Sequence, residues 1–197
     1  MKILVACEYS ACVREAFKTL GHDVTSCDIL PTAIAGKHYQ GDVMDIIDQD
    51  WDLLICFPTC TYLCSSGLHW NKKIPDRAQK TEQGLLFVDA LLNANIPKIA
   101  LENPIGCISS RIRKPDQIIQ PYQFGENASK STCLWLKNLP KLIPTKHIEP
   151  RIVNGKNRWA NQTDSGQNHL GPSENRAQLR GTTYQGIADA MAQQWGI

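Results

Sequence analysis

Two short segments of the sequence carry side chains suited to covalent chemistry on a heteroaromatic ring. Cys60 follows an apolar run in the turn Phe57-Pro58-Thr59-Cys60, where a thiol with a lowered pKa can act as a nucleophile. Glu102 ends a second apolar run, and a desolvated glutamate can hold a proton near neutral pH and donate it to a ring nitrogen. The alternatives are a buried structural cysteine and an acid that caps the next loop. The position of Cys60 after a strand favours the functional interpretation.

Two other kinds of cysteine chemistry fit the sequence less well. Cys56, Cys60 and Cys64 repeat every four residues, but Pro58 breaks a helix, and an extended chain separates successive members by about 13 Å. They also lack the C-x-x-C spacing of structural zinc sites, so we expect no metal here. A hydrolase with an acylated Cys60 would need an orienting histidine, and His69, the nearest in sequence, has no evident partner acid.

Acidic residues follow the predicted strands where a cofactor would bind. Asp28 follows the second strand and Asp42 the third, and a carboxylate accepts two hydrogen bonds from neighbouring ribose hydroxyls. Each is otherwise a surface acid or a helix cap. Residues 7–20 contain no glycine, so a G-x-G-x-x-G phosphate turn is absent. This argues against a dinucleotide held by its pyrophosphate and leaves open an adenosyl ligand without phosphate.

The elements that must position these residues alternate between strand and helix. Apolar runs predict buried parallel strands, and stretches with helical spacing lie between them. We therefore predict an α/β fold with a three-layer, doubly wound, mostly parallel sheet, which binds ligands at the carboxyl ends of its strands. The first and second strands are expected at 2–7 and 23–28, a third before Asp42, and the fourth and fifth at 51–56 and 97–102. The helices are expected at 13–20, with Ser10 as a possible N-cap, and at 77–94.

The rest of the chain is less regular in its pattern. We expect a loop from Pro58 to about Asp76, a strand at 132–136, a polar loop at 154–181 and a final helix at 184–195. The many prolines between Gly106 and Arg180 agree with this irregularity.

Composition indicates a single soluble domain spanning residues 1–197. The chain is 42% hydrophobic and 20% charged, and its net charge of +2 is too small for a protein that coats nucleic acid, so such contact requires a local patch. The apolar run at the N-terminus is too short for a membrane span and lacks the cleavage region of a signal peptide. We therefore expect a cytoplasmic protein whose eight cysteines are reduced thiols.

The order and spacing of these motifs resemble those of DNA (cytosine-5) methyltransferases. The sequence is most similar to small, often phage- or prophage-encoded proteins described as cytosine-methyltransferase-like. Phe57-Pro58-Thr59-Cys60 resembles the Pro-Cys nucleophile loop, and Glu102-Asn103-Pro104 resembles the Glu-Asn-Val element. Lys130-Ser131-Thr132 is similar in position to the Gln-x-Arg strand, and Gly181 to Ala188 resembles the start of the last helix.

The resemblance implies a Rossmann-like fold that uses S-adenosyl-L-methionine to methylate C5 of cytosine in DNA, through a thiolate intermediate. It implies catalytic roles for Cys60, Glu102 and Lys130. The implied cofactor residues are Glu8, Tyr9, Ser10, Ala11, Asp28, Ile29, Asp42, Val43, Phe57, Pro58, Thr183 and Tyr184. The implied substrate residues are Thr61, Ser65, Asn103, Pro104, Arg111 and Arg113, and Lys114, Lys130 and Lys137 are further candidates for phosphate contacts.

The sequence departs from the family pattern at several positions. Thr59 stands in place of a proline, Ala11 and Cys12 in place of loop glycines, and the arginines of the Gln-x-Arg strand are absent. Residues 141–180 form a short irregular insert where the family carries a target-recognition domain. Two alternatives therefore stay open: a methyltransferase that acts on a nucleotide, single-stranded DNA or RNA, and a degenerate protein that binds cofactor, nucleic acid or a protein partner.

Overall fold

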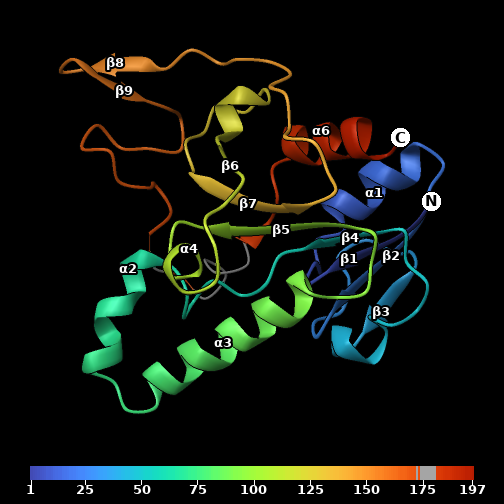
Figure 1. Cartoon of the computed structure of the whole chain (residues 1–197). Coiled ribbons are helices and arrows are strands. Elements are labelled where there is room, and N and C mark those ends of the chain that lie inside the picture. The colour runs from blue at the N-terminus through green and yellow to red at the C-terminus, as the bar shows by residue number, and fades with distance from the viewer. Residues whose placement is uncertain (172, 174–180) are drawn as a thin grey trace.

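The centre of the protein is a seven-stranded sheet with the strand order β3-β2-β1-β4-β5-β7-β6 (Figure 1). The computed structural model describes residues 1–171, 173 and 181–197. Strands β1 to β5 are parallel to their neighbours, and β7 is antiparallel to both β5 and β6. The strands are β1 Lys2–Ala6, β2 Asp23–Asp28, β3 His38–Gln40, β4 Leu53–Cys56, β5 Lys98–Pro104, β6 Gln117–Ile119 and β7 Thr132–Lys137.

Helices cover both faces of this sheet. Helix α3 crosses one face, while α1 and α6 lie together on the other (Figure 1). The helices are α1 Cys12–Thr19, α2 Ser65–Leu68, α3 Arg77–Leu92, α4 Ile108–Arg111 and α6 Gln185–Trp195, with the 3-10 turns η1 Val43–Asp45, η2 His69–Lys72 and η3 Pro121–Gln123. A separate hairpin pairs β8 Arg151–Val153 with β9 Lys156–Arg158.

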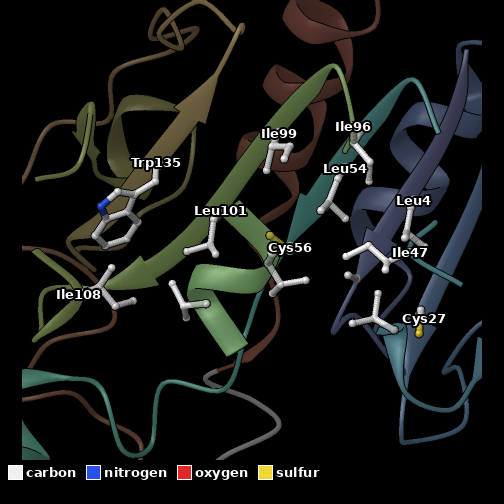
Figure 2. Packing of buried hydrophobic residues seen from close by; sticks show 14 of the residues in the cluster. Leu4, Cys27, Ile47, Leu54, Cys56, Ile96, Ile99, Leu101, Ile108 and Trp135 are labelled. Carbon is white, nitrogen blue, oxygen red and sulfur yellow. The ribbon is translucent and has the colours of Figure 1, made fainter. Parts of the chain in front are cut away.

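The alternation of strand side chains explains the two cores. Successive residues of a strand point to opposite faces, so Leu54 packs on the α3 side and Ile55 on the α1 and α6 side. Figure 2 shows the first core, in which Leu4, Leu54, Ile99 and Trp135 come from four strands of the sheet. Burying both faces requires the continuous apolar runs seen in the sequence. The predicted α/β fold with a three-layer, doubly wound, mostly parallel sheet is confirmed.

Several local predictions were wrong. The segment between Pro58 and Asp76 contains α2 and η2 instead of a continuous loop. Strand β5 continues past Glu102 to Pro104, because β7 supplies partners for two further residues. Ser10 is not the N-cap of α1, since Ala11 holds that position with a left-handed φ of 63°.

The prediction of a polar loop at 154–181 was also wrong in part. It contains β9, which pairs with β8. Residues 172 and 174–180 of that stretch lie outside the described residues.

Candidate functional site

The carboxyl end of β4 leads directly into the turn that carries Cys60. The backbone N–H of Phe57 still donates to Ala6 of β1, at 3.0 Å, and Pro58 is buried. The carbonyl of Cys60 then accepts the backbone N–H groups of Leu63 and Cys64, both at 3.0 Å, which closes a helical turn. The half-buried thiol is therefore held at the edge of the sheet by the backbone on both sides.

Strand β5 clamps this turn through Asn103. Its Nδ2 donates to the carbonyl oxygen of Pro58 at 2.7 Å, and the side chain is 1% exposed. Its Oδ1 is buried and finds no donor among the described residues. The opposite orientation of the amide would place two oxygens together, so the hydrogen bond fixes it. Asn103, predicted to bind substrate, thus positions the Cys60 turn in this structure.

Glu102, next to Asn103 on β5, carries a carboxyl group that retains its proton more strongly than a free glutamate. Burial raises its pKa, while the Lys130 ammonium and a hydrogen bond from the Thr132 hydroxyl oppose the shift. A carboxyl group that keeps its proton to a higher pH than usual can act as a proton donor to a ring nitrogen.

Cys60 lies in the electrostatic field of the same groups. Burial raises the pKa of its thiol, and Cys64 and Glu102 raise it further. The Lys130 ammonium and the backbone N–H of Cys60 lower it. Lys130 therefore favours the ionised forms of both Cys60 and Glu102. The structure brings together the three residues that the sequence analysis assigned to catalysis.

The segment that carries Lys130 is fixed by two side chains that sequence reasoning missed. Gln120 accepts the backbone N–H of Lys130 at 2.9 Å and donates to the Ser131 hydroxyl at 2.7 Å. The side chain of Asn161 accepts the backbone N–H of Ser129 and donates to the Ser129 carbonyl, each at 2.9 Å. Amide side chains in a polar stretch carry no periodic signal, so nothing in the sequence marks these two.

A small cavity lies beside this cluster, between the end of the sheet and α6. Two aromatic rings, Phe57 after β4 and Tyr184 before α6, contribute to its wall. Its lining residues are Phe57, Glu102, Lys130, Thr132, Gly181, Thr183, Tyr184, Ile187 and Met191. Three residues predicted to bind cofactor, Phe57, Thr183 and Tyr184, thus share one cavity with two predicted catalytic residues.

The first loop uses its acid to cap α1. The carboxylate of Glu8 accepts the backbone N–H groups of Val13 at 2.6 Å and Arg14 at 3.2 Å. Glu8 is 4% exposed, and burial raises its pKa to about 7 even though these hydrogen bonds lower it. Ser10 donates to Glu8 at 3.4 Å, and the Tyr9 hydroxyl lies 3.4 Å from that of Thr182. The helix N-terminus is thus already occupied by a carboxylate.

Asp28 and Asp42 lie at the same edge of the sheet, further along it. Asp28 accepts the N–H of Leu30 at 2.9 Å, and Asp42 accepts that of Met44 at 3.0 Å as the N-cap of η1. Ile29 is 77% exposed, whereas Val43 is buried. Both acids have local backbone partners, and neither lines the cavity.

The loop after β2 is anchored by Arg14, which sequence reasoning also missed. Its guanidinium is fully buried and donates to the hydroxyls of Ser26 and Thr32 and to the carbonyls of Ile34 and Ala35. Gly36 passes so close that a Cβ there would lie 2.8 Å from the guanidinium carbon. This buried cation holds the loop that follows Asp28 against α1.

The predicted substrate residues fall into two groups. Thr61, Ser65 and Pro104 surround the Cys60 turn, and the backbone N–H of Ser65 donates to Ile105 at 3.0 Å. Arg111 instead forms a two-armed ion pair with Glu82, at 2.8 and 3.0 Å, and Arg113 pairs with Asp116 at 2.7 Å. The two arginines are exposed but are committed to carboxylates in this structure.

Comparison with known proteins gives a fold-level similarity. No family model matches the sequence, and no curated protein matches it either. Among 49 matching chains of solved structures is a crystal structure from E. coli, provisionally described as a DNA modification methyltransferase encoded within a prophage. It aligns with a TM-score of 0.47 and 15% identity, over 74% of this chain and 51% of that chain. The chain thus spans about half the length of that structure. A likeness at this level describes the course of the chain and carries no information on function.

Two further observations concern the described residues as a whole. Within them, no helix is both long enough and apolar enough to cross a bilayer. The same residues contain no cluster of three or more His, Cys, Asp or Glu side chains arranged to hold a metal ion. All eight cysteines are free thiols.

Proposed function

We propose that this protein transfers a methyl group from S-adenosyl-L-methionine to C5 of cytosine in DNA. The observation that carries the proposal is that Cys60 after β4, Glu102 within β5 and Lys130 before β7 lie in one electrostatic cluster, and that Glu102 and Lys130 line one cavity. In the proposal residues 1–197 are one catalytic domain, with 141–180 as a shortened insert in place of a target-recognition domain.

The cofactor assignment is supported by the first loop. A phosphate at the start of α1 would need the backbone N–H groups of Val13 and Arg14, which Glu8 already occupies. A carboxylate at this position repels a phosphate and attracts a cation such as a sulfonium. Aromatic faces also attract cations, and Phe57 and Tyr184 line the cavity. The residues present therefore fit S-adenosylmethionine better than a dinucleotide.

We assign the remaining cofactor contacts to the loops that follow β1, β2 and β3. One carboxylate oxygen of Asp28 accepts the backbone N–H of Leu30. We assign the other oxygen to a ribose hydroxyl. In this assignment Ile29 and Val43 flank the adenine, with Asp42 nearby. Tyr9, Ser10, Ala11, Pro58 and Thr183 complete the predicted set.

The chain's own residues carry out the chemistry on the base. The Cys60 thiolate adds to C6 of the cytosine ring while the Glu102 carboxyl donates its proton to N3, so that the displaced electron pair develops at C5. The bound cofactor supplies an electrophilic methyl group for that carbon. Once C5 carries the methyl group, loss of its proton to a base restores the ring double bond and expels the Cys60 thiolate. The proton on N3 then returns to Glu102. The target base must lie outside a base stack for this geometry.

Lys130 supports both charge changes in this sequence. Its ammonium favours the thiolate of Cys60 before attack and the carboxylate of Glu102 after proton donation. Asn103 keeps the Cys60 turn in place through Pro58. Thr61, Ser65 and Pro104 surround the position of the base, and Arg111 and Arg113 are proposed to contact phosphates once they exchange their carboxylate partners.

The proposal is tested by incubation with cofactor labelled in its methyl group and with cytosine-containing duplex DNA, single-stranded DNA, RNA and free nucleotide. Label is expected in nucleic acid with the wild type and not with Cys60→Ser. Cys64→Ser, four residues further on, is the matched control and is expected to retain transfer. Absence of label from every substrate, or equal label from Cys60→Ser, would overturn the proposal.

A 5-fluorocytosine substrate provides a second readout. Fluorine cannot leave C5 as a cation, so the sulfur–C6 bond is expected to persist after methylation, and the protein should gain the mass of the oligonucleotide and the methyl group. Cys64→Ser is expected to give the same adduct. An adduct located on any cysteine other than Cys60 would contradict the assignment of the nucleophile.

A further inference from the structure

The segment from Tyr62 to Lys80, which follows the Cys60 turn, forms a surface of which the catalytic proposal uses only Ser65; we call it the basic arm. It contains four basic residues and one acidic residue, a net charge of +3, which exceeds the +2 of the whole chain. Helix α2 and η2, which it contains, lie beyond the edge of the sheet at one end of α3 (Figure 1). A polyanion would meet this arm as a local patch of positive charge.

The basic arm exposes the chain's accessible tryptophan. Trp70 is 45% exposed, whereas Trp51, Trp135, Trp159 and Trp195 are each at most 8% exposed. The ring of His69 lies 4.8 Å from that of Trp70, and the ammonium of Lys73 lies 5.3 Å from its centre. Ile74, next along the arm, is 47% exposed. An indole that is nearly half exposed, with a lysine ammonium over its ring, is a surface on which a nucleic-acid base can stack.

The lysines of the arm are available to phosphates. Lys72, Lys73 and Lys80 are exposed and have no ion pair to any described residue. This distinguishes them from Arg111 and Arg113, whose guanidinium groups are paired with carboxylates. The first phosphate contacts are therefore expected on the arm and not on the arginines.

Hydrogen bonds tie the basic arm to the Cys60 turn. The guanidinium of Arg77 donates to the carbonyl of Thr61 at 2.8 Å and lies 4.9 Å from the centre of the Tyr62 ring. The hydroxyl of Thr81 donates to the carbonyl of Tyr62 at 2.9 Å and accepts from Asn71 at 2.9 Å. A nucleic-acid strand bound to the arm would thus lie at a fixed position relative to Cys60.

We propose that the basic arm binds single-stranded nucleic acid, with a base stacked on Trp70 and phosphates on Lys72, Lys73 and Lys80. A duplex hides the faces of its bases and offers mainly phosphates, whereas an unpaired base offers the face that an exposed indole matches. The link from the arm to catalysis rests on the proposed function, but binding to the arm does not.

The test uses oligothymidylate, which contains no cytosine, so that binding is measured apart from methyl transfer. Single-stranded oligothymidylate is expected to quench tryptophan emission, because Trp70 is the exposed emitter. Trp70→Leu is expected to abolish the quenching and weaken binding about tenfold, the typical loss of one stacked base. Trp70→Phe should restore most of the affinity. Oligothymidylate offers no cytosine to methylate, so a failure of the catalytic proposal leaves this result unchanged.

The lysines are tested through salt dependence. Each phosphate contact to a single strand contributes about 0.7 to the magnitude of the slope of the logarithm of the binding constant against the logarithm of the salt concentration. The double variant Lys72→Gln/Lys73→Gln should therefore lower the magnitude of the slope by about 1.4. Lys18→Gln, an exposed lysine on α1, is the matched control and should leave the slope unchanged. These variants keep the test valid if Trp70→Leu does not fold, as judged by circular dichroism.

Four results would overturn the proposal. The first is that neither oligothymidylate nor oligouridylate binds, and the second is that a duplex of the same length binds with equal affinity. The third is that substitution of Trp70 leaves the affinity unchanged. The fourth is that polyglutamate binds equally tightly and in a Trp70-dependent way. The last would assign the arm to an acidic protein. Preference between oligothymidylate and oligouridylate identifies the natural strand as DNA or RNA, and either preference supports the arm.

Discussion

Residues 1–61 and residues 105–171 differ in both regularity and charge. The first region is built of parallel strands with short connections and has a net charge of −5, from nine acidic and four basic residues. The second contains the antiparallel β7 and the β8–β9 hairpin and has a net charge of +6, from ten basic and four acidic residues. A net charge near zero thus conceals two regions of opposite sign.

The two regions also use arginine differently, which leads to the largest expected effect. Arg14 is fully buried, pairs with Glu15 at 2.9 Å, and donates to the Ser26 hydroxyl of β2 and to one hydroxyl and two carbonyls of the loop that follows. Arg111 forms an exposed pair with Glu82, in which the side chains are 50% and 55% exposed. We expect Arg14→Met to lower the free energy of unfolding by about 4 kcal/mol, because it removes every hydrogen bond of a buried guanidinium and leaves the buried Ser26 hydroxyl without this donor.

The matched variant in the basic region is Arg111→Met, which should cost about 0.5 kcal/mol, as is usual for exposed pairs. Urea denaturation followed by circular dichroism measures both. Similar losses for the two arginines would show that the loop after β2 is not anchored by the buried cation, and the contrast between the regions would then fail.

The second prediction concerns Glu8 and the pH dependence of stability. Burial raises the pKa of Glu8 from 4.5 to about 7 in the folded protein. Its contribution to stability is therefore fully present below about pH 4.5 and is lost as the pH rises to 7, a change of about 3 kcal/mol. Glu8→Gln removes this titration. The difference in stability between wild type and variant should shift by that amount between pH 4.5 and 7.

Glu82→Gln is the control of opposite sign. Arg111 lowers the pKa of Glu82, so the contribution of this carboxylate is present above pH 4.5 and is lost only as the pH falls below it. Because the pair is exposed, the change should be small. If the curves of wild type and Glu8→Gln ran parallel from pH 4.5 to 7, the hydrogen bonds from Val13 and Arg14 would outweigh burial at Glu8.

The regular region was largely predictable from the sequence because its elements repeat one simple pattern. The apolar run before Cys7 and the run before Phe57 each predicted a buried strand, and the positions of Cys60 and Glu102 after such runs predicted a shared site. The region of residues 105–171 was less predictable. Its strands β6 and β8 have only three residues each, and their pairing depends on distant partners. One local signal was overlooked there: Asn154-Gly155, a dipeptide typical of tight hairpins, with φ values of 49° and 73°.

Side-chain anchors escaped prediction for a different reason. Arg14, Gln120 and Asn161 each act on backbone groups at least ten residues away in the chain. A residue type at one position does not reveal which carbonyl or N–H it will meet after folding. The sequence suggests which residues to propose for catalysis by their type and position, whereas it does not reveal the groups that hold them in place.

The smallest expected effect on stability concerns two residues with a left-handed backbone conformation, one in each region. Ala11 has a φ of 63° at the start of α1 and is fully buried, while Asn154 has a φ of 49° in the β8–β9 turn. A left-handed conformation costs an ordinary residue roughly 1 kcal/mol, but asparagine tolerates it. Ala11→Gly should therefore stabilise the protein by about 1 kcal/mol, whereas Asn154→Gly should change stability by only about 0.3 kcal/mol.

Ala11→Gly also tests whether this side chain crowds the cofactor, since the resembling family has glycine in this loop. If it does, the variant should bind S-adenosylmethionine more tightly in calorimetry, and Asn154→Gly should not. A gain in stability without a gain in affinity would show that the methyl group of Ala11 strains only the backbone. A loss of stability in Ala11→Gly would mean that the buried methyl group contributes more by packing than the left-handed conformation costs.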